Sequence, residues 1–257
     1  MARTELFCPA TTSTSPAFRA IETRAKLLRR NTAGKDNCIK RFRFGTRNLS
    51  SVATLADDVH QNVFRLQVQS SIAQSVFQAL LGYLPSAIRT WFESSFPEWT
   101  IPSQLILKKQ KEGWDEEFEM EKATYAKLGP LQGIVIPKLF GEVRCDNTRA
   151  LLLSDIGGVC LATPEGALLE LADFRRLLCQ ALTALSQFRI LQEDIKLDNF
   201  HLVDDKVMIV DLEKVSEEPL SDQDLDFGIK SAVDSLATFY ERNQYCFWKE
   251  GLVSIAM

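Results

Sequence analysis

The stretch QEDIKLDNFHLVDDKVMIVDLEKV, residues 192–215, constrains the fold more than any other part of the sequence. It holds Asp194, Lys196 and Asn199 in a D-x-K-x-x-N spacing, followed by two short apolar runs on either side of an Asp-Asp pair. This pattern predicts a loop, a strand, a tight turn and a second strand that ends at Asp211. A hairpin of that length would fold the Asp211 carboxylate back beside Asn199.

The part of the chain before this stretch predicts a strand followed by a helix. The run QLILKKQK is short and apolar and ends in lysines, which is typical of a buried strand with a basic end. Since a strand alternates its faces, only one of Lys108 and Lys109 can point into a cleft. The run WDEEFEMEKATYAKL then shows helical spacing and closes at Gly-Pro, so Glu117 and Glu121 belong to a helix.

Periodicity and turn residues predict the remaining elements, and together they indicate an α+β protein. We expect a strand in VFRLQVQ, a helix in SSIAQSVFQALLGYL, a proline-punctuated connector in PSAIRTWFESSFPEWTIP, a hairpin formed by VIPKLFGEV and ALLLSDIGG, helical packing over residues 166–188, and a last helix around DFGIKSAVDSLATFYERN.

Charge and composition limit the possible functions. Residues 1–50 hold 11 Lys and Arg against 3 Asp and Glu, so the remaining residues are acidic overall. We expect this basic segment to be mostly disordered, with a nuclear address, a contact with an anionic surface and organelle targeting as alternatives to a plain solvated tail. An acidic body without an aromatic and basic stripe disfavours nucleic-acid binding.

Other sequence features point to an intracellular protein, cytoplasmic or nuclear. No apolar run approaches the roughly 20 residues needed to cross a bilayer, and the N-terminus lacks a secretory signal pattern. The six cysteines contain no C-x-x-C and are expected to be reduced thiols. The two histidines have no neighbourhood suited to a Ser-His-Asp triad or a histidine-rich metal centre.

The order of these motifs from about residue 100 to 215 resembles the protein-kinase-like superfamily. More narrowly, the segments LKKQK, LLLSDIGG and DIKLDNF resemble short kinase-like proteins of filamentous fungi. The resemblance implies a protein-kinase-like two-lobed α+β fold with a shortened C-terminal lobe. It divides the chain into the basic segment 1–50, an N-terminal lobe at 51–153 and a truncated C-terminal lobe at 154–257.

The resemblance also implies ATP and Mg²⁺ as cofactors and assigns a role to each candidate residue. For the nucleotide, it implies that Lys108 contacts the phosphates and pairs with Glu121, with Lys109 and Glu117 as alternatives, and that the backbone near Ser154 and Asp155 holds the adenine. For transfer, it implies that Asp194 orients or deprotonates the acceptor hydroxyl and that Lys196 neutralises the transferring phosphate. For the metal, it implies Asn199 and Asp211, with Glu213 as a further candidate ligand.

Several departures from the kinase pattern leave two functions open. Gln192 and Glu193 replace the usual His-Arg, Asp-Leu-Glu replaces Asp-Phe-Gly at residues 211–213, and no glycine-rich loop precedes Lys108. The literal DFG at 226–228 is interpreted as a coincidence. The first hypothesis is a phosphotransferase whose acceptor is a protein hydroxyl or a small molecule. The second is a pseudokinase that binds nucleotide or protein without transfer.

Overall fold

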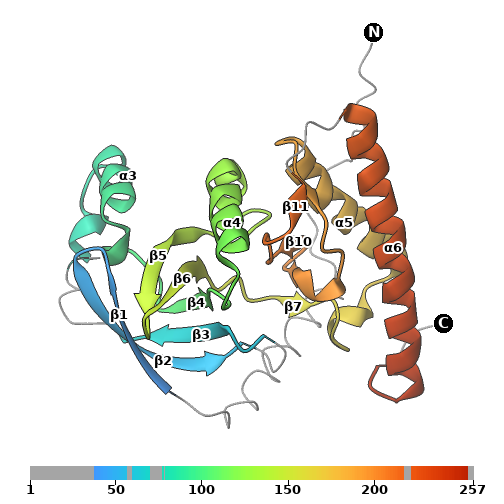
Figure 1. Ribbon diagram of the computed structural model, residues 1–257, viewed down its shortest axis with the longest axis horizontal. Coiled ribbons are helices and arrows are strands. Elements are labelled where there is room, and N and C mark those ends of the chain that lie inside the picture. Colours follow the sequence, from blue (N-terminus) through green and yellow to red (C-terminus); the bar gives the residue numbers. More distant parts are fainter. Residues whose placement is uncertain (1–37, 57–59, 70–76, 78, 217–220, 254–257) are drawn as a thin grey trace.

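The computed structural model describes residues 38–56, 60–69, 77, 79–216 and 221–253. They form two parts that lie side by side, one built on a strongly curved sheet and the other mainly on two helices (Figure 1). This mixed content agrees with the expected α+β class, while the domain boundaries that the kinase resemblance implies stay a prediction. The shortening of the C-terminal lobe stays a prediction.

The first part is a closed antiparallel sheet in the order β1-β2-β3-β4-β6-β5. Pairing of Arg43 with Arg144 joins the first strand to the last. The inward faces of the strands bury a separate apolar core that includes Phe42, Leu66 and Leu105. The strands are β1 (Cys38–Phe44), β2 (Arg47–Leu55), β3 (Val63–Val68), β4 (Gln104–Lys109), β5 (Leu139–Cys145) and β6 (Thr148–Ser154).

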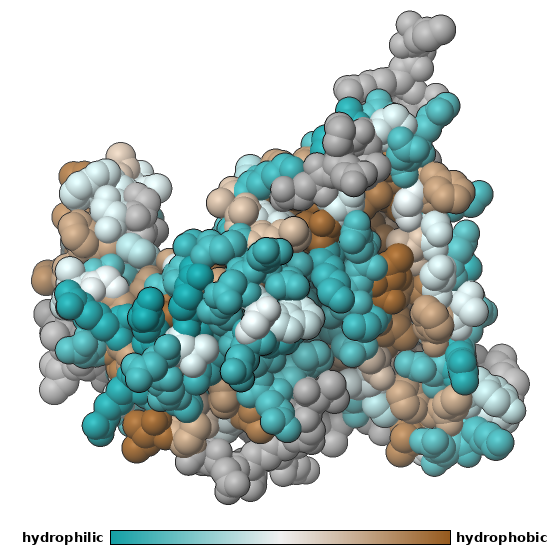
Figure 2. Space-filling view, in the orientation of Figure 1, coloured by the Kyte–Doolittle hydropathy of each residue, from teal (hydrophilic) through white to brown (hydrophobic). Residues whose placement is uncertain are grey.

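Two α-helices that lie wholly within the described residues accompany the sheet. Helix α4 (Asp115–Lys127) follows β4 and buries Phe118, Glu121, Thr124 and Tyr125. Helix α3 (Ser86–Ser95) stands apart from the sheet (Figure 1) and exposes large apolar side chains such as Trp91. In Figure 2 the face over the strands is mostly hydrophilic. Short 3-10 helices follow the two α-helices: η1 (Pro97–Trp99) and η2 (Gly129–Leu131).

The second part packs helices α5 (Leu171–Ser186) and α6 (Asp222–Lys249) against short strands and a larger apolar core. A capping box between Ser221 and Asp224 begins α6. None of the described helices is both long and apolar enough to cross a membrane. The small elements are β7 (Val159–Cys160), η3 (Gly166–Leu168), β8 (Leu191–Gln192), η4 (Leu197–Asn199), β9 (Phe200–Val203), β10 (Lys206–Ile209) and β11 (Val215–Ser216).

Most predicted elements are confirmed, but two expectations are corrected. Residues 38–50, which were expected to belong to a disordered basic segment, form β1 and the start of β2. In β1 the side chains of Phe42 and Phe44 are buried, while those of Arg41 and Arg43 are exposed. The charged residues on the outer face concealed the alternation that is typical of a strand. The expected connector after Pro85 contains α3 and η1. The literal DFG lies within α6, where Phe227 is exposed, which agrees with its interpretation as a coincidence. Residues 1–37 and most of the predicted helix at 70–84 lie outside the described residues.

Tyr240 fastens α6 to the segment before α5, and its removal is expected to destabilise the second part. Its ring stacks on the Phe174 ring, with the two centroids 4.1 Å apart. Its hydroxyl accepts a hydrogen bond from the Leu169 N–H at 2.9 Å and donates one to the Gly166 backbone oxygen at 2.9 Å. Tyr240→Phe should lower the free energy of unfolding by about 1–3 kcal/mol, because buried backbone groups lose their partner. Urea unfolding measures this, with the exposed Tyr245→Phe as control. Equal midpoints for the two variants would contradict it.

Candidate functional site

Lys108 and Glu121 form a buried ion pair between the sheet and α4. The Lys108 Nζ atom lies 2.8 Å from Glu121 Oε1, and the two side chains are only 8% and 1% exposed. Neighbouring Lys109 is directed elsewhere and binds Asp146 at 3.1 Å. The structure therefore forms the expected pair through Lys108 and Glu121, not through the alternatives Lys109 and Glu117, and it is not an ordinary surface pair.

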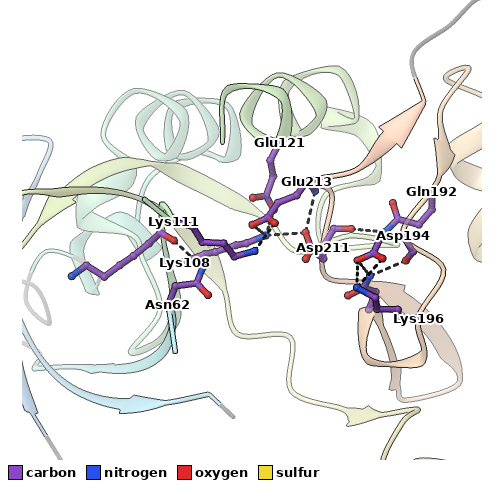
Figure 3. A network of polar contacts seen from close by, with 11 residues as sticks. Asn62, Lys108, Lys111, Glu121, Gln192, Asp194, Lys196, Asp211 and Glu213 are labelled. Atoms are coloured by element: carbon purple, nitrogen blue, oxygen red, sulfur yellow. Dashed lines mark hydrogen bonds and ion pairs between the residues drawn. The ribbon is translucent and has the colours of Figure 1, made fainter. Parts of the chain in front are cut away.

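Two more carboxylates meet the same ammonium group. Lys108 Nζ lies 2.9 Å from Asp211 Oδ1 and 3.0 Å from Glu213 Oε1 (Figure 3). Asp211 Oδ1 also accepts the Glu213 backbone N–H at 3.0 Å, while Leu212 between them is fully buried. The turn thus directs both acidic side chains toward Lys108. We call Glu121, Asp211 and Glu213 the carboxylate cluster.

Burial and charge perturb these groups in different directions. Burial acts to lower the pKa of Lys108, but the three carboxylates outweigh it and raise that pKa above its ordinary value. Burial raises the pKa of Glu121 above its usual range even though Lys108 opposes the shift. Burial also acts to raise the pKa of Asp211, but Lys108 outweighs it and holds the pKa below its usual range. Lys108 therefore stays charged and Asp211 stays ionised at neutral pH.

The D-x-K-x-x-N residues form a second, adjacent group. Asp194 accepts hydrogen bonds from Lys196 Nζ at 3.1 Å and from Asn199 Nδ2 at 3.3 Å. Asn199 Nδ2 also donates to the Asp194 backbone oxygen at 2.9 Å, and the Asn199 carbonyl accepts the Val210 N–H at 3.0 Å. These bonds hold the loop against the end of β10, directly before Asp211, as the hairpin spacing predicted.

Gln192 links the two groups and was missed as a functional candidate. Its side-chain Nε2 donates to the Asp211 backbone oxygen at 2.8 Å, and the residue is 5% exposed (Figure 3). Pairing of β8 with β11 places it there, because Gln192 lies opposite Val215. In the sequence, Gln192 is notable only as the residue that replaces the histidine usual in kinases. A glutamine amide is also a hydrogen-bond donor, and that property was the available signal.

Ser154 and Asp155 lie at the junction between the two parts and make contacts that fix the chain. Asp155 binds Arg65 Nε at 2.8 Å through Oδ2 and accepts the Gly157 N–H at 3.1 Å through Oδ1. Ser154 Oγ accepts the Lys138 N–H at 2.8 Å. Both side chains therefore serve the fold, and the expected contact of the local backbone with adenine stays a prediction.

The chemistry of the cluster suits a hard divalent cation. Oxygen atoms of Glu121, Asp211 and Glu213 lie within 4.8 Å of one another, and carboxylate oxygens are the ligands that Mg²⁺ prefers. The Lys108 ammonium group contacts all three, which shows that this point favours positive charge. Asn199, predicted as a metal ligand, lies on the Asp194 side, and its role with the metal stays a prediction.

No family model and no curated protein sequence matches this chain. Similar solved structures include kinase domains of PknI from Mycobacterium tuberculosis. A cysteine-to-alanine variant has a TM-score of 0.46 and 12% identity, covering 74% of this chain and 73% of that chain. Another PknI kinase domain has a TM-score of 0.45 and 11% identity, covering 74% and 71%.

Proposed function

We propose that this chain is an ATP- and Mg²⁺-dependent phosphotransferase of the protein-kinase-like superfamily. The observation that carries the proposal is the buried ion pair of Lys108 with Glu121, together with Asp211, whose Oδ1 atom lies 2.9 Å from the Lys108 ammonium nitrogen. Phosphate transfer from ATP needs a fixed cation for the phosphates and carboxylates for the metal in one place. Gln192 then joins Asp211 to the loop that carries Asp194, so both halves of the reaction centre are fixed to each other.

Some residues of the site would bind ATP and Mg²⁺, and others would act in the transfer of phosphate. Lys108, oriented by Glu121, would hold the phosphates of ATP, and Asp211 with Glu213 or Asn199 would hold Mg²⁺. The metal would neutralise charge on the phosphates. Asp194 would accept the proton of an acceptor hydroxyl while the oxygen of that hydroxyl attacks the terminal phosphorus of ATP. The bond between this phosphorus and the bridging oxygen breaks, and ADP leaves. Lys196, which is 60% exposed and lies 2.9 Å from Asp194, would neutralise charge on the transferring group.

The acceptor is a protein serine or threonine hydroxyl, or the hydroxyl of a small molecule. ATP dependence fits the intracellular location expected from the sequence. The narrower likeness to short fungal kinase-like proteins rests on the sequence segments alone and belongs to this proposal.

The direct test is Mg²⁺-dependent turnover of ATP labelled at the terminal phosphate. Wild-type protein should transfer label to generic protein acceptors, small alcohols or, more slowly, water. Asp211→Asn, which preserves shape but removes a metal-binding charge, should lose this turnover while keeping the wild-type circular dichroism spectrum. ATP consumption that is equal in the two proteins, or independent of Mg²⁺, would overturn the proposal.

A pseudokinase is the second candidate function. It is favoured by the glycine-free sequence ADDVHQN at residues 56–62, between β2 and β3, where kinases cover the phosphates with a glycine-rich loop. Poorer cover admits water and weakens binding of the phosphates. Nucleotide binding without detectable transfer to any acceptor would favour this candidate.

A further inference from the structure

Lys111 lies beyond the end of β4, and its ammonium group returns to the carboxylate cluster. Its Nζ atom lies 2.7 Å from Glu213 Oε2 and 4.5 Å from the centre of the Trp114 ring. Attraction of the cation to the ring face adds to the ion pair in holding the side chain. Both contacts direct Lys111 into a small recess lined by Lys108, Trp114, Glu121 and Glu213.

Both oxygen atoms of Glu213 are held by lysines. Lys108 lies 3.0 Å from Oε1, and Lys111 lies 2.7 Å from Oε2. A metal ion bound by Glu213 would lie beside both ammonium groups, and repulsion between these positive charges favours the departure of one lysine. Lys108 is 8% exposed and has two further carboxylates, whereas Lys111 is 32% exposed, and Glu213 is its one ion-pair partner in the described part of the chain. Lys111 is the cation that can leave.

A nucleoside triphosphate bound beside Lys108 needs further positive charge around its phosphates. The sequence ADDVHQN between β2 and β3 contains two aspartates and no glycine, so it is poorly suited to a cradle of backbone N–H groups. Lys111 and the expected phosphate-binding Lys108 share the Glu213 carboxylate, so a Lys111 side chain released from it would begin beside Lys108. A flexible ammonium group of this kind binds phosphate as a point charge.

We propose that Lys111 is a second phosphate-binding residue that exchanges partners. It binds Glu213 when the cleft holds no ligand, and it binds the terminal phosphates of a nucleoside triphosphate when a metal ion engages Glu213. The inference rests on the proposed function and deepens it, because it names a cation that takes the place of the glycine-rich loop.

The test measures binding in two separate experiments on the full chain, with Lys109→Met as matched control. Lys109 is the same residue type nearby, but its ammonium group binds Asp146 instead of a carboxylate of the cluster. Without nucleotide, Lys111→Met should bind Mn²⁺, a spectroscopic substitute for Mg²⁺, about fivefold more tightly by electron paramagnetic resonance, because Glu213 is released. With Mg²⁺ at a concentration that saturates both proteins, it should bind ATP roughly tenfold more weakly by calorimetry and adenosine equally well. Lys111→Arg, which keeps the charge, should retain most ATP affinity.

The opposite directions of the two effects distinguish this inference from a loss of stability, which would weaken both ligands. ATP affinity of Lys111→Met equal to that of wild type would overturn the exchange while leaving the proposed function intact. Unchanged Mn²⁺ affinity would also overturn it, because Glu213 would then not be the competing partner. Wild-type protein that binds neither ATP nor Mn²⁺ would contradict the proposed function itself, and the exchange with it.

Discussion

Lys108→Met is expected to lower the free energy of unfolding by about 3–5 kcal/mol, because it leaves buried carboxylates without their shared cation. Glu121 is 1% exposed, and Asp211 and Glu213 are 21% and 12% exposed, so water screens them poorly. Chemical denaturation at pH 8 measures the loss. Lys109→Met removes a more exposed pair with Asp146 and should cost less than about 1 kcal/mol.

The deficit of Lys108→Met should also depend on pH. Burial already raises the pKa of Glu121; without the ammonium group that pKa rises further and the lowering of the Asp211 pKa is lost, so the folded variant binds more protons than the unfolded chain. Its stability then falls as the pH rises, and its deficit relative to wild type should be smaller at pH 5 than at pH 8. The double variant Lys108→Met/Glu121→Leu should recover part of the loss. A deficit that is constant with pH would contradict this account of the cluster.

Asp194→Asn is expected to lower phosphate transfer by about 10²–10⁴-fold while leaving ATP affinity within about twofold of wild type. The amide keeps the shape of the side chain but cannot accept the proton of the acceptor hydroxyl. ATP affinity should hold because Lys108, Glu121 and Asp211 stay in place. Transfer is measured under single-turnover conditions, and binding is measured by calorimetry.

Asp198→Asn is the matched control for Asp194. Asp198 lies in the same loop, in η4, but its side chain is exposed to solvent. This variant should keep both transfer and ATP binding. Equal transfer by Asp194→Asn and wild type would remove Asp194 from the reaction, and a matching loss in Asp198→Asn would indicate a general disturbance of the loop.

Much of the site could be predicted because its residues belong to local patterns. The alternation of β4 limited the choice to Lys108 or Lys109, and the hairpin formed by β9 and β10 determined how Asp211 returns toward Asn199. Which lysine points inward could not be decided from the sequence. That choice depends on pairing of Lys108 with both Val63 and Leu151, residues that are distant along the chain.

The missed features depend on tertiary contacts between residues far apart in the sequence. Lys111 belongs to a basic run that reads as the solvated end of a strand, and its contact with Glu213 joins residues 102 positions apart. Gln192 was judged by what it replaces, although its amide can donate the hydrogen bond to Asp211. The first strand was missed because Arg41 and Arg43 mark its outer face and resemble a basic tail.

The thermal shift produced by ATP, with and without Mg²⁺, tests the central claim most directly. At about 100 times its dissociation constant, a ligand should stabilise the folded protein by roughly 2.7 kcal/mol. We predict a shift for wild type that increases with Mg²⁺, and no such Mg²⁺-dependent increase for Asp211→Asn. If neither protein shifts with ATP, or both shift equally with Mg²⁺, the Lys108–Glu121–Asp211 arrangement is not a working nucleotide site.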